Sequence, residues 1–302
     1  MKKAMNAVVA TRRSALALAQ ARAFASDLQR ANPGLVVEEL HVTTTGDRIQ
    51  DRALNQIGGK GLFIKEVEQA LLDGMASFAV HSLKDVPAEL AEGLTIACVP
   101  RRADARDVIV TRDGRRFADL AAGSRIGTSS LRRAVQLLER RPDLQIVPVR
   151  GNVDTRLHRC REGHVDAVVL ARAGLLRLGL EPDATEILTP EICLPAIGQG
   201  ALAIECRAND DQMVSLLARA DDDETRIAVS AERGVMIAAQ GSCQVPIAAY
   251  AQRDGMELIL RALLADGDGT NVRRGQRRVA WPKDAGAAET VGLDLGGELR
   301  AR

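Results

Sequence analysis

Apolar segments of strand length alternate with amphipathic segments of helix length through the first two thirds of this chain. Ala7–Ala10 has the apolar run of a short strand, and Ala15–Arg30 has the periodicity of a helix that ends before Pro33. The alternation resumes after Pro100 and continues to an apolar strand predicted at Val165–Ala171. Units of this kind form a mostly parallel sheet with ligand-binding loops after the strands, so the pattern predicts an α/β fold.

The last third of the 302 residues departs from this alternation. A long helix is predicted at Glu224–Ala239, and two alternating runs at Glu257–Leu264 and Asn271–Ala280 are typical of a β-hairpin. A chain of this length can form two or three domains. The predicted joints between domains lie at residues 99–104, 194–199 and 220–224.

Arginine supplies all the basic residues in the middle of the chain. The whole sequence is nearly neutral, with 41 Lys+Arg against 40 Asp+Glu. Residues 101–177 nevertheless hold 17 arginines, no lysine and nine acidic residues. Arginine forks bind carboxylates and phosphates through two parallel hydrogen bonds. A general preference for arginine over lysine would explain the residue type but not the cluster, so we predict an anion-binding region.

Composition argues against several other classes of protein. Aromatic residues make up 2%, too few for the stacking platforms of nucleic-acid-binding proteins. No apolar run is long enough to span a membrane, and Arg12 and Arg13 interrupt the N-terminal segment before a signal peptide could form. The five cysteines form no CxxC pair and the four histidines lack ligand spacing, so we expect no disulfide framework and no metal site. We expect a cytoplasmic protein that binds neither nucleic acid nor membrane.

Three predicted strand-to-helix junctions combine arginine with a small polar residue. Thr128–Arg133 places Ser130 before a predicted helix and two arginines in the first turn of that helix. Positive charge at a helix N-terminus is unfavourable unless an anion binds there, although two arginines that extend into solvent would also explain the pattern. Arg150 and Arg12 follow other predicted strands. Together the three junctions predict a cleft that binds carboxylates.

Two further segments hold candidate reactive side chains. Asp85 follows a predicted strand, where a carboxylate could stabilise a developing cation. Most aspartates before a proline-containing turn are turn or cap residues, and the local sequence favours that interpretation. Cys243 lies between small residues in Gly241–Pro246 and could be an exposed nucleophile or a buried loop cysteine. Its neighbours in the sequence leave both roles open.

Seven segments, in order along nearly the whole chain, resemble the porphobilinogen deaminase (hydroxymethylbilane synthase) family. They are Ala10–Ser14, Gly58–Phe63, His81–Pro87, Gly127–Arg133, Arg150–Val153, Leu194–Gly200 and Gly241–Pro246. The resemblance implies two α/β lobes with the topology of periplasmic binding proteins around a cleft, and a smaller α/β C-terminal domain. The implied domains are 1–100 with 200–218, then 105–194, and finally 222–302.

The resemblance also implies an enzyme of tetrapyrrole (haem) biosynthesis. The family is a transferase that carries a dipyrromethane cofactor on a cysteine through a thioether. It adds four porphobilinogen units head to tail, releases ammonia each time, and frees linear hydroxymethylbilane by hydrolysis. Each pyrrole carries two carboxylates, which suits a cleft lined by arginine. Porphobilinogen is therefore the expected substrate, and we expect the enzyme to be a monomer.

Site residues are implied by the resemblance position by position. Cys243 matches the cofactor attachment residue, and Asp85 matches the catalytic carboxylate that contacts pyrrole N–H groups. The matches for the cofactor's carboxylates are Lys84, Ser130, Arg132, Arg133 and Arg156. The matches for substrate binding are Arg12, Ser14, Arg150, Arg177, Gln199 and, in a loop over the cleft, Lys60 and Phe63. No metal is implied.

Two positions depart from the family pattern. Asp154 stands where the family commonly has a neutral residue, and an acid there could weaken a contact of Arg156 or simply face solvent. Gly296 and Gly297 stand where relatives often have a longer apolar helix, so we expect a short final helix. The alternative function is a noncatalytic, effector-sensing module that binds anions on a periplasmic-binding-protein fold. That alternative leaves Cys243 without a role.

Overall fold

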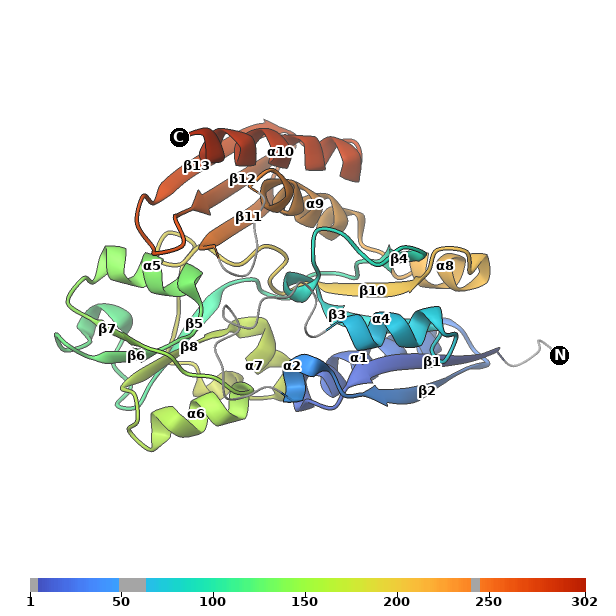
Figure 1. Cartoon of the computed structure of the whole chain (residues 1–302), viewed down its shortest axis with the longest axis horizontal. Coiled ribbons are helices and arrows are strands. Elements are labelled where there is room, and N and C mark those ends of the chain that lie inside the picture. Colours follow the sequence, from blue (N-terminus) through green and yellow to red (C-terminus); the bar gives the residue numbers. More distant parts are fainter. Residues whose placement is uncertain (1–4, 49–63, 240–244) are drawn as a thin grey trace. The chain divides into compact units, whose positions relative to one another are not determined.

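The computed structural model describes residues 5–48, 64–239 and 245–302, and Figure 1 shows their helices and strands. Contacts within the chain divide it into two compact units. Unit 1 comprises residues 1–102 and 201–226, and unit 2 comprises residues 103–200 and 227–302. Within the described residues, no helix is both long enough and apolar enough to cross a bilayer.

Unit 1 is an α/β lobe built on a mixed five-stranded sheet. The strand order is β2-β1-β3-β10-β4. Strands β2 and β3 run parallel to β1, whereas β10 runs antiparallel to both β3 and β4. The elements are β1 (Met5–Arg12), α1 (Ala15–Ala31), β2 (Leu35–Val42), α2 (Thr45–Arg48), α4 (Lys65–Leu72), β3 (Phe78–Ser82), η1 (Leu83–Asp85), β4 (Leu94–Cys98), β10 (Leu202–Arg207) and α8 (Asp211–Ala218).

Apolar side chains bind helices to the sheet of unit 1. Phe24 of α1 packs edge to face on Phe78 of β3, with the ring centroids 6.0 Å apart. Both rings belong to a buried cluster that includes Leu217 of α8. Val67 and Leu71 of α4 join a separate cluster with residues of β1 and β3. The apolar faces of these helices are therefore buried against the sheet and hold the strand ends in place.

The first part of unit 2 is a second α/β lobe with the same strand pattern. Its sheet has the order β7-β6-β8-β5-β9, with β7 and β8 parallel to β6 and with β5 antiparallel to β8 and β9. Each lobe thus has three parallel strands, one reversed strand and an edge strand. The elements are β5 (Asp107–Thr111), η2 (Phe117–Asp119), β6 (Arg125–Gly127), α5 (Leu131–Arg140), β7 (Gln145–Val147), α6 (Val153–Arg161), β8 (Ala167–Ala171), α7 (Arg172–Leu178), η3 (Glu181–Asp183) and β9 (Glu186–Ile187).

The prediction of two α/β lobes is confirmed. In each sheet four of the five strands run in one direction, as a mostly parallel sheet requires, and one strand, β10 or β5, is reversed. Both sheets are mixed because each receives a strand from a segment that crosses between the units. Strand β10 enters unit 1 only after the chain has passed through residues 103–200 of unit 2. Its apolar sequence predicts a buried strand but does not state the direction in which that strand will pair.

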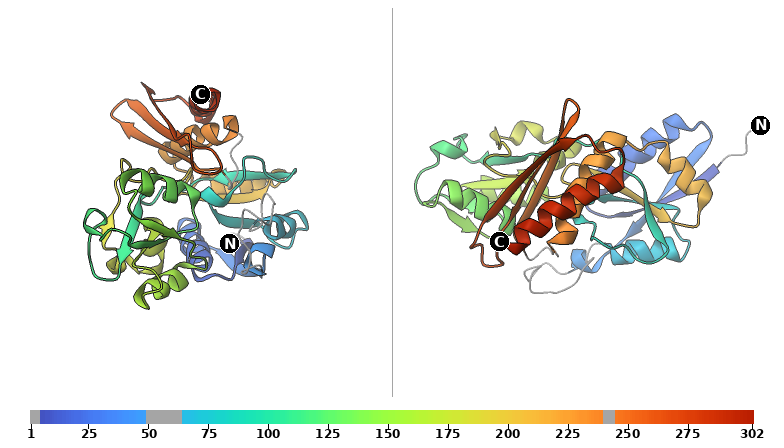
Figure 2. Two further views of the ribbon diagram at one scale, coloured as in Figure 1. Left: turned by 60° about the vertical axis from the view of Figure 1, so that its left-hand side comes forward. Right: turned by 90° about the horizontal axis from the view of Figure 1, so that it is seen from above.

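The C-terminal part of unit 2 is a smaller sheet covered by two helices (Figure 2). The antiparallel strands have the order β11-β12-β13. The elements are α9 (Asp223–Ala238), whose first turn lies in unit 1, β11 (Ile247–Asp254), β12 (Glu257–Leu264), β13 (Arg273–Ala280) and α10 (Ala285–Ala301). The predicted hairpin is confirmed as β12 and β13.

The expected short final helix is wrong, since α10 has 17 residues. Its Leu295 and Leu299 are fully buried. Gly296, one of the two glycines behind that prediction, allows close packing together with Gly292, because a Cβ atom on Gly296 would lie 2.7 Å from the carbonyl oxygen of Val235 and one on Gly292 would lie 2.0 Å from that of Ala231, both in α9. Helix-interior glycine lowers intrinsic stability, but here it permits contact between two backbones.

Candidate active site

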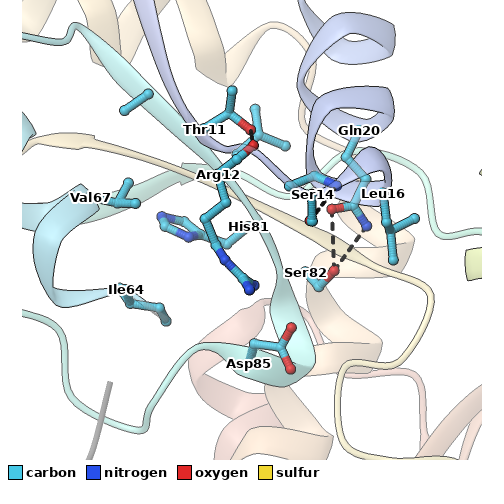
Figure 3. A pocket seen from close by; sticks show the side chains of 13 residues that line it. Thr11, Arg12, Ser14, Leu16, Gln20, Ile64, Val67, His81, Ser82 and Asp85 are labelled. Atoms are coloured by element: carbon cyan, nitrogen blue, oxygen red, sulfur yellow. Dashed lines mark hydrogen bonds between the residues drawn. The ribbon is translucent and has the colours of Figure 1, made fainter. Parts of the chain in front are cut away.

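Two neighbouring strands of unit 1 end at one small pocket. Strand β1 ends at Arg12, and β3 leads through η1 to Asp85. Because β1 and β3 are parallel, their carboxyl ends lie at the same edge of the sheet. The pocket has a volume of about 70 Å³, and its lining includes Arg12, Ser14, His81 and Asp85 (Figure 3). The structure therefore brings together residues that the sequence places in two distant motifs.

Arg12 is oriented by a carboxylate that sequence reasoning missed. Its Nε donates to both carboxylate oxygens of Asp47 at 3.2 Å, and its Nη2 donates to Oδ1 as well. The Thr44 hydroxyl donates to the same carboxylate at 2.7 Å. Although burial opposes the shift, the hydrogen bond from Arg12 lowers the pKa of Asp47. The only signal in the sequence is a polar turn at residues 43–47.

Asp85 is exposed at the end of a short 3-10 turn. The turn is closed by the Val86 N–H, which donates to the Leu83 carbonyl at 3.1 Å. The turn interpretation is therefore confirmed, and the same turn directs the carboxylate into the pocket (Figure 3). Its neighbour Lys84 is also exposed. Ser14 lines the pocket while its hydroxyl caps α1, where it accepts the Ala17 N–H at 3.3 Å.

A buried imidazole–carboxylate pair lies beside this pocket. His81 Nε2 is 2.9 Å from Glu205 Oε2, and the two side chains are 8% and 1% exposed. Burial and then the charge of Glu205 raise the pKa of nearby Glu68. Neither acid belongs to a motif of the sequence, since Glu205 lies on β10, 124 positions from His81, and Glu68 lies on α4.

In the second lobe, polar residues that follow the parallel strands β6 and β7 cap the next helices. Ser130 caps α5 and accepts the Arg133 N–H, whereas Asn152 caps α6 and accepts the Thr155 N–H at 2.9 Å. Arg156 in the first turn of α6 donates from Nε to the Gly151 carbonyl at 2.9 Å. Arg150 is half-buried, and its buried Nη1 makes no hydrogen bond with any described residue.

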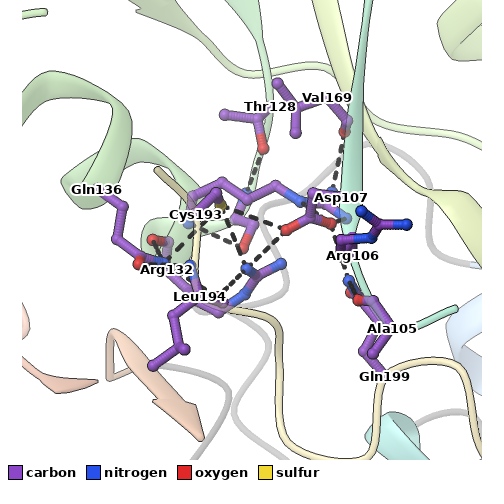
Figure 4. A network of polar contacts seen from close by, with 12 residues as sticks. Ala105, Arg106, Asp107, Thr128, Arg132, Gln136, Val169, Cys193, Leu194 and Gln199 are labelled. Atoms are coloured by element: carbon purple, nitrogen blue, oxygen red, sulfur yellow. Dashed lines mark hydrogen bonds and ion pairs between the residues drawn. The ribbon is translucent and has the colours of Figure 1, made fainter. Parts of the chain in front are cut away.

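Both arginines at the start of α5 have a carboxylate partner within the chain. Arg132 Nη1 lies 2.8 Å from Asp107 Oδ2, and Arg133 Nη2 lies 2.8 Å from Asp107 Oδ1 (Figure 4). Both arginines are only 6% exposed, so neither extends into solvent as the alternative required. Asp107 begins a strand 25 positions before Arg132, so the local sequence does not reveal this partner, and the binding of a ligand anion at this helix stays a prediction.

Two other predicted site residues have hydrogen-bond partners within unit 2. Gln199 is 1% exposed and donates from Nε2 to Asp107 at 2.9 Å and to the Ala105 carbonyl at 2.6 Å. Arg177 on α7 donates from Nη2 to the Gly200 carbonyl at 2.8 Å. Burial lowers the pKa of Arg177 to about 10, which still leaves the guanidinium charged at neutral pH. Neither side chain was predicted to have these internal partners.

Comparison with known proteins assigns the family. The family model described as "Porphobilinogen deaminase, dipyromethane cofactor binding domain" matches residues 7–215, and the one described as "Porphobilinogen deaminase, C-terminal domain" matches residues 226–301. The chain belongs to the porphobilinogen deaminase family. A porphobilinogen deaminase of Sorangium cellulosum (strain So ce56) is 63% identical over 292 residues, 97% of each chain. One from Roseiflexus sp. (strain RS-1) is 49% identical over 286 residues, 95% of this chain and 92% of the relative.

Membership in the porphobilinogen deaminase family makes the chain an enzyme of the transferase class, with a domain for the dipyrromethane cofactor. The noncatalytic alternative is therefore set aside. Asp154, the acid where the family commonly has a neutral residue, is exposed on α6. Three residues predicted from the family motifs, Lys60, Phe63 and Cys243, lie outside the described residues. Among residues 5–48, 64–239 and 245–302, no group of side chains could hold a metal ion.

Proposed function

We propose that this chain is a hydroxymethylbilane synthase that acts as a cytoplasmic monomer, without nucleic acid or membrane as a partner. It condenses four porphobilinogen units head to tail, releases ammonia at each addition, and frees the linear tetrapyrrole by hydrolysis. The observation that carries the proposal is the position of Asp85 in one pocket with Arg12 and Ser14, in a chain of this family.

Asp85 is the proposed catalytic residue. Loss of ammonia from the substrate leaves positive charge on a pyrrole ring and its N–H group. An exposed carboxylate at the pocket can accept a hydrogen bond from that N–H and stabilise the charge as it develops. Arg12, fixed by Asp47, and Ser14 are the proposed partners for the carboxylates of the same substrate. The pocket can thus bind the developing positive charge and the carboxylates of one substrate molecule through different side chains.

The remaining predicted residues are proposed to bind the other carboxylates. The side chains of the second lobe fit carboxylate ligands chemically, because Arg150 has a buried Nη1 that lacks a partner among the described residues. Arg156, Ser130, Lys84 and the Arg132–Arg133 pair are proposed for the cofactor's acetate and propionate groups. Arg150, Arg177, Gln199, Lys60 and Phe63 are proposed for the substrate and the growing chain.

The thiol of Cys243 is the proposed attachment point of the dipyrromethane. When bound, that group supplies the primer to which substrate units are added. The four described cysteines, Cys98, Cys160, Cys193 and Cys206, are all buried, and burial raises the pKa of each thiol. Raised pKa values disfavour the nucleophilic thiolate, which leaves Cys243 as the candidate for attachment.

Intact-mass measurement of the purified active protein tests the proposal. We expect an adduct with the mass of two pyrrole units, and we expect the Cys243→Ala variant to lack both the adduct and the release of ammonia from porphobilinogen. Cys160→Ala is the matched control and should keep both. An unmodified mass in active enzyme would refute covalent attachment, and inactivity of adduct-bearing protein would refute the reaction.

A further inference from the structure

The carboxylate of Asp107 lies at the centre of a buried polar cluster in unit 2 (Figure 4). Its Oδ2 accepts Arg132 Nη1 at 2.8 Å, and its Oδ1 accepts Arg133 Nη2 at 2.8 Å and Gln199 Nε2 at 2.9 Å. Asp107 is fully buried, and all three partners are at most 6% exposed. The family motifs in the sequence include the three partners but not Asp107 itself.

Backbone carbonyls also accept hydrogen bonds from both guanidinium groups. Arg132 Nη1 also donates to the Leu194 carbonyl at 2.7 Å, and Arg133 Nη1 donates to the Val169 carbonyl at 3.0 Å. Each arginine is therefore held between Asp107 and a carbonyl of a different segment. Long arginine side chains lose much rotamer freedom in such an arrangement, which prepares them to bind a ligand without further ordering.

The cluster contains two positive charges and one negative charge. Although burial opposes the shift, the charges of Arg132 and Arg133 lower the pKa of Asp107, so its carboxylate stays ionised. No other carboxylate of the described residues forms an ion pair with either arginine. An excess positive charge away from water is unfavourable unless an anion compensates it. The positive N-terminal end of α5 adds to that excess.

We propose that Asp107 is a positioning residue, which holds Arg132 and Arg133 in one geometry and leaves one of their two charges for a carboxylate of the ligand. The inference rests on the proposed function, because the ligand carboxylates are the acetate and propionate groups of pyrroles. It assigns a role to a residue outside the family motifs. Gln199 then acts through Asp107, since its amide donates to that carboxylate.

The test compares Asp107→Asn with the control Asp166→Asn, which removes the same charge from the partner of Arg125 in the same lobe. In holoenzyme, we expect Asp107→Asn to raise KM for porphobilinogen about tenfold or more, with a smaller effect on kcat. In the Cys243→Ala background, we expect succinate, compared with chloride at equal ionic strength, to raise the Tm of Asp166→Asn by about 3 °C more than that of Asp107→Asn. Asp107→Asn loses this stabilisation because Arg132 and Arg133 are no longer held in the geometry that binds a carboxylate.

A purely structural Asp107 predicts a different outcome. In that case Asp107→Asn would lower the Tm equally in chloride and in succinate and would leave the KM unchanged. That result would overturn the proposal. Should Asp107→Asn fail to fold, Asp107→Asn/Arg133→Gln restores the charge balance. We expect this double variant to fold and to keep the raised KM, whereas a wild-type KM would also overturn the proposal. If the wild-type protein proves inactive and lacks the adduct, the proposed function fails, and the succinate comparison still tests Asp107.

Discussion

At the scale of single residues, the same side chain can be both a turn residue and a candidate catalyst. Asp85 lies in a 3-10 turn that follows β3, and this turn places its carboxylate beside Arg12. The local sequence favoured only the first role, because the neighbours of Asp85 in the pocket come from β1. Arg12 likewise depends on Asp47, which lies 35 positions further along the chain.

Replacing Asp85 with asparagine tests its role directly. We expect Asp85→Asn to keep the free energy of unfolding within about 0.5 kcal/mol, because the side chain is exposed. We expect kcat for ammonia release to fall about a hundredfold or more, because a neutral amide stabilises a cation poorly. Glu89→Gln, an exposed change of the same charge in the following turn, should have near-normal kcat. Normal turnover by Asp85→Asn would remove this residue from the mechanism.

At the scale of secondary-structure elements, glycine permits α9 and α10 to pack with their backbones in contact. A Cβ atom on Gly234 would lie 2.2 Å from the Glu289 carbonyl oxygen, and one on Gly296 would lie 2.7 Å from the Val235 carbonyl oxygen. Distances below 3.0 Å to a backbone atom require the helices to move apart. In contrast, a Cβ atom on Gly297 would point into open space.

Two alanine substitutions in α10 should therefore have opposite effects. We expect Gly292→Ala to lower the free energy of unfolding by about 1–3 kcal/mol, since its Cβ would overlap α9. We expect Gly297→Ala to raise it by about 0.5–1 kcal/mol, since alanine favours the helix and meets no neighbour. Urea unfolding followed by the fluorescence of Trp281, the only tryptophan, measures both. Equal effects of the two substitutions would contradict the packing argument.

At the scale of the whole molecule, the basic middle of the chain is largely neutralised by its own acids. At least nine of its 17 arginines form ion pairs within unit 2: Arg106, Arg115, Arg116, Arg125, Arg132, Arg133, Arg141, Arg161 and Arg172. The charge excess seen in the sequence is therefore no measure of the charge offered to a ligand. Among the arginines outside these ion pairs, Arg150 has a buried Nη1 without a hydrogen-bond partner among the described residues.

These internal ion pairs predict that unit 2 loses stability in acid. Although burial opposes the shift, hydrogen bonds from Arg106 lower the pKa of Asp104 to about 2, and the pKa of Asp107 is lowered too. An acid with a depressed folded-state pKa stabilises the fold above its unfolded pKa of about 3.9, and this contribution disappears as the pH falls towards 2. We expect urea unfolding followed by Trp281 to show this loss between about pH 4 and pH 2.

Asp104→Asn provides the comparison for this acid sensitivity. We expect the variant to be about 1 kcal/mol less stable than wild type at pH 7 and to approach wild-type stability near pH 2. The remaining loss of stability with falling pH belongs to Asp107 and the other paired acids of the unit. An unchanged pH dependence in Asp104→Asn would contradict the assignment of this effect to the Asp104–Arg106–Arg172 contacts.

Local patterns in the sequence predicted the first strand and helix of the chain, the buried strand at Val165–Ala171, the C-terminal hairpin and the family motifs, because periodicity, caps and turns are local properties. The tertiary structure alone decided the direction of β10, the length of α10 and the partners of the arginines. Those outcomes depend on contacts between distant segments: Asp47 with Arg12, Asp107 with Arg132 and Arg133, and Gly292 with Ala231. A sequence pattern can show that an arginine needs an anion, but only the folded chain shows which carboxylate is within reach.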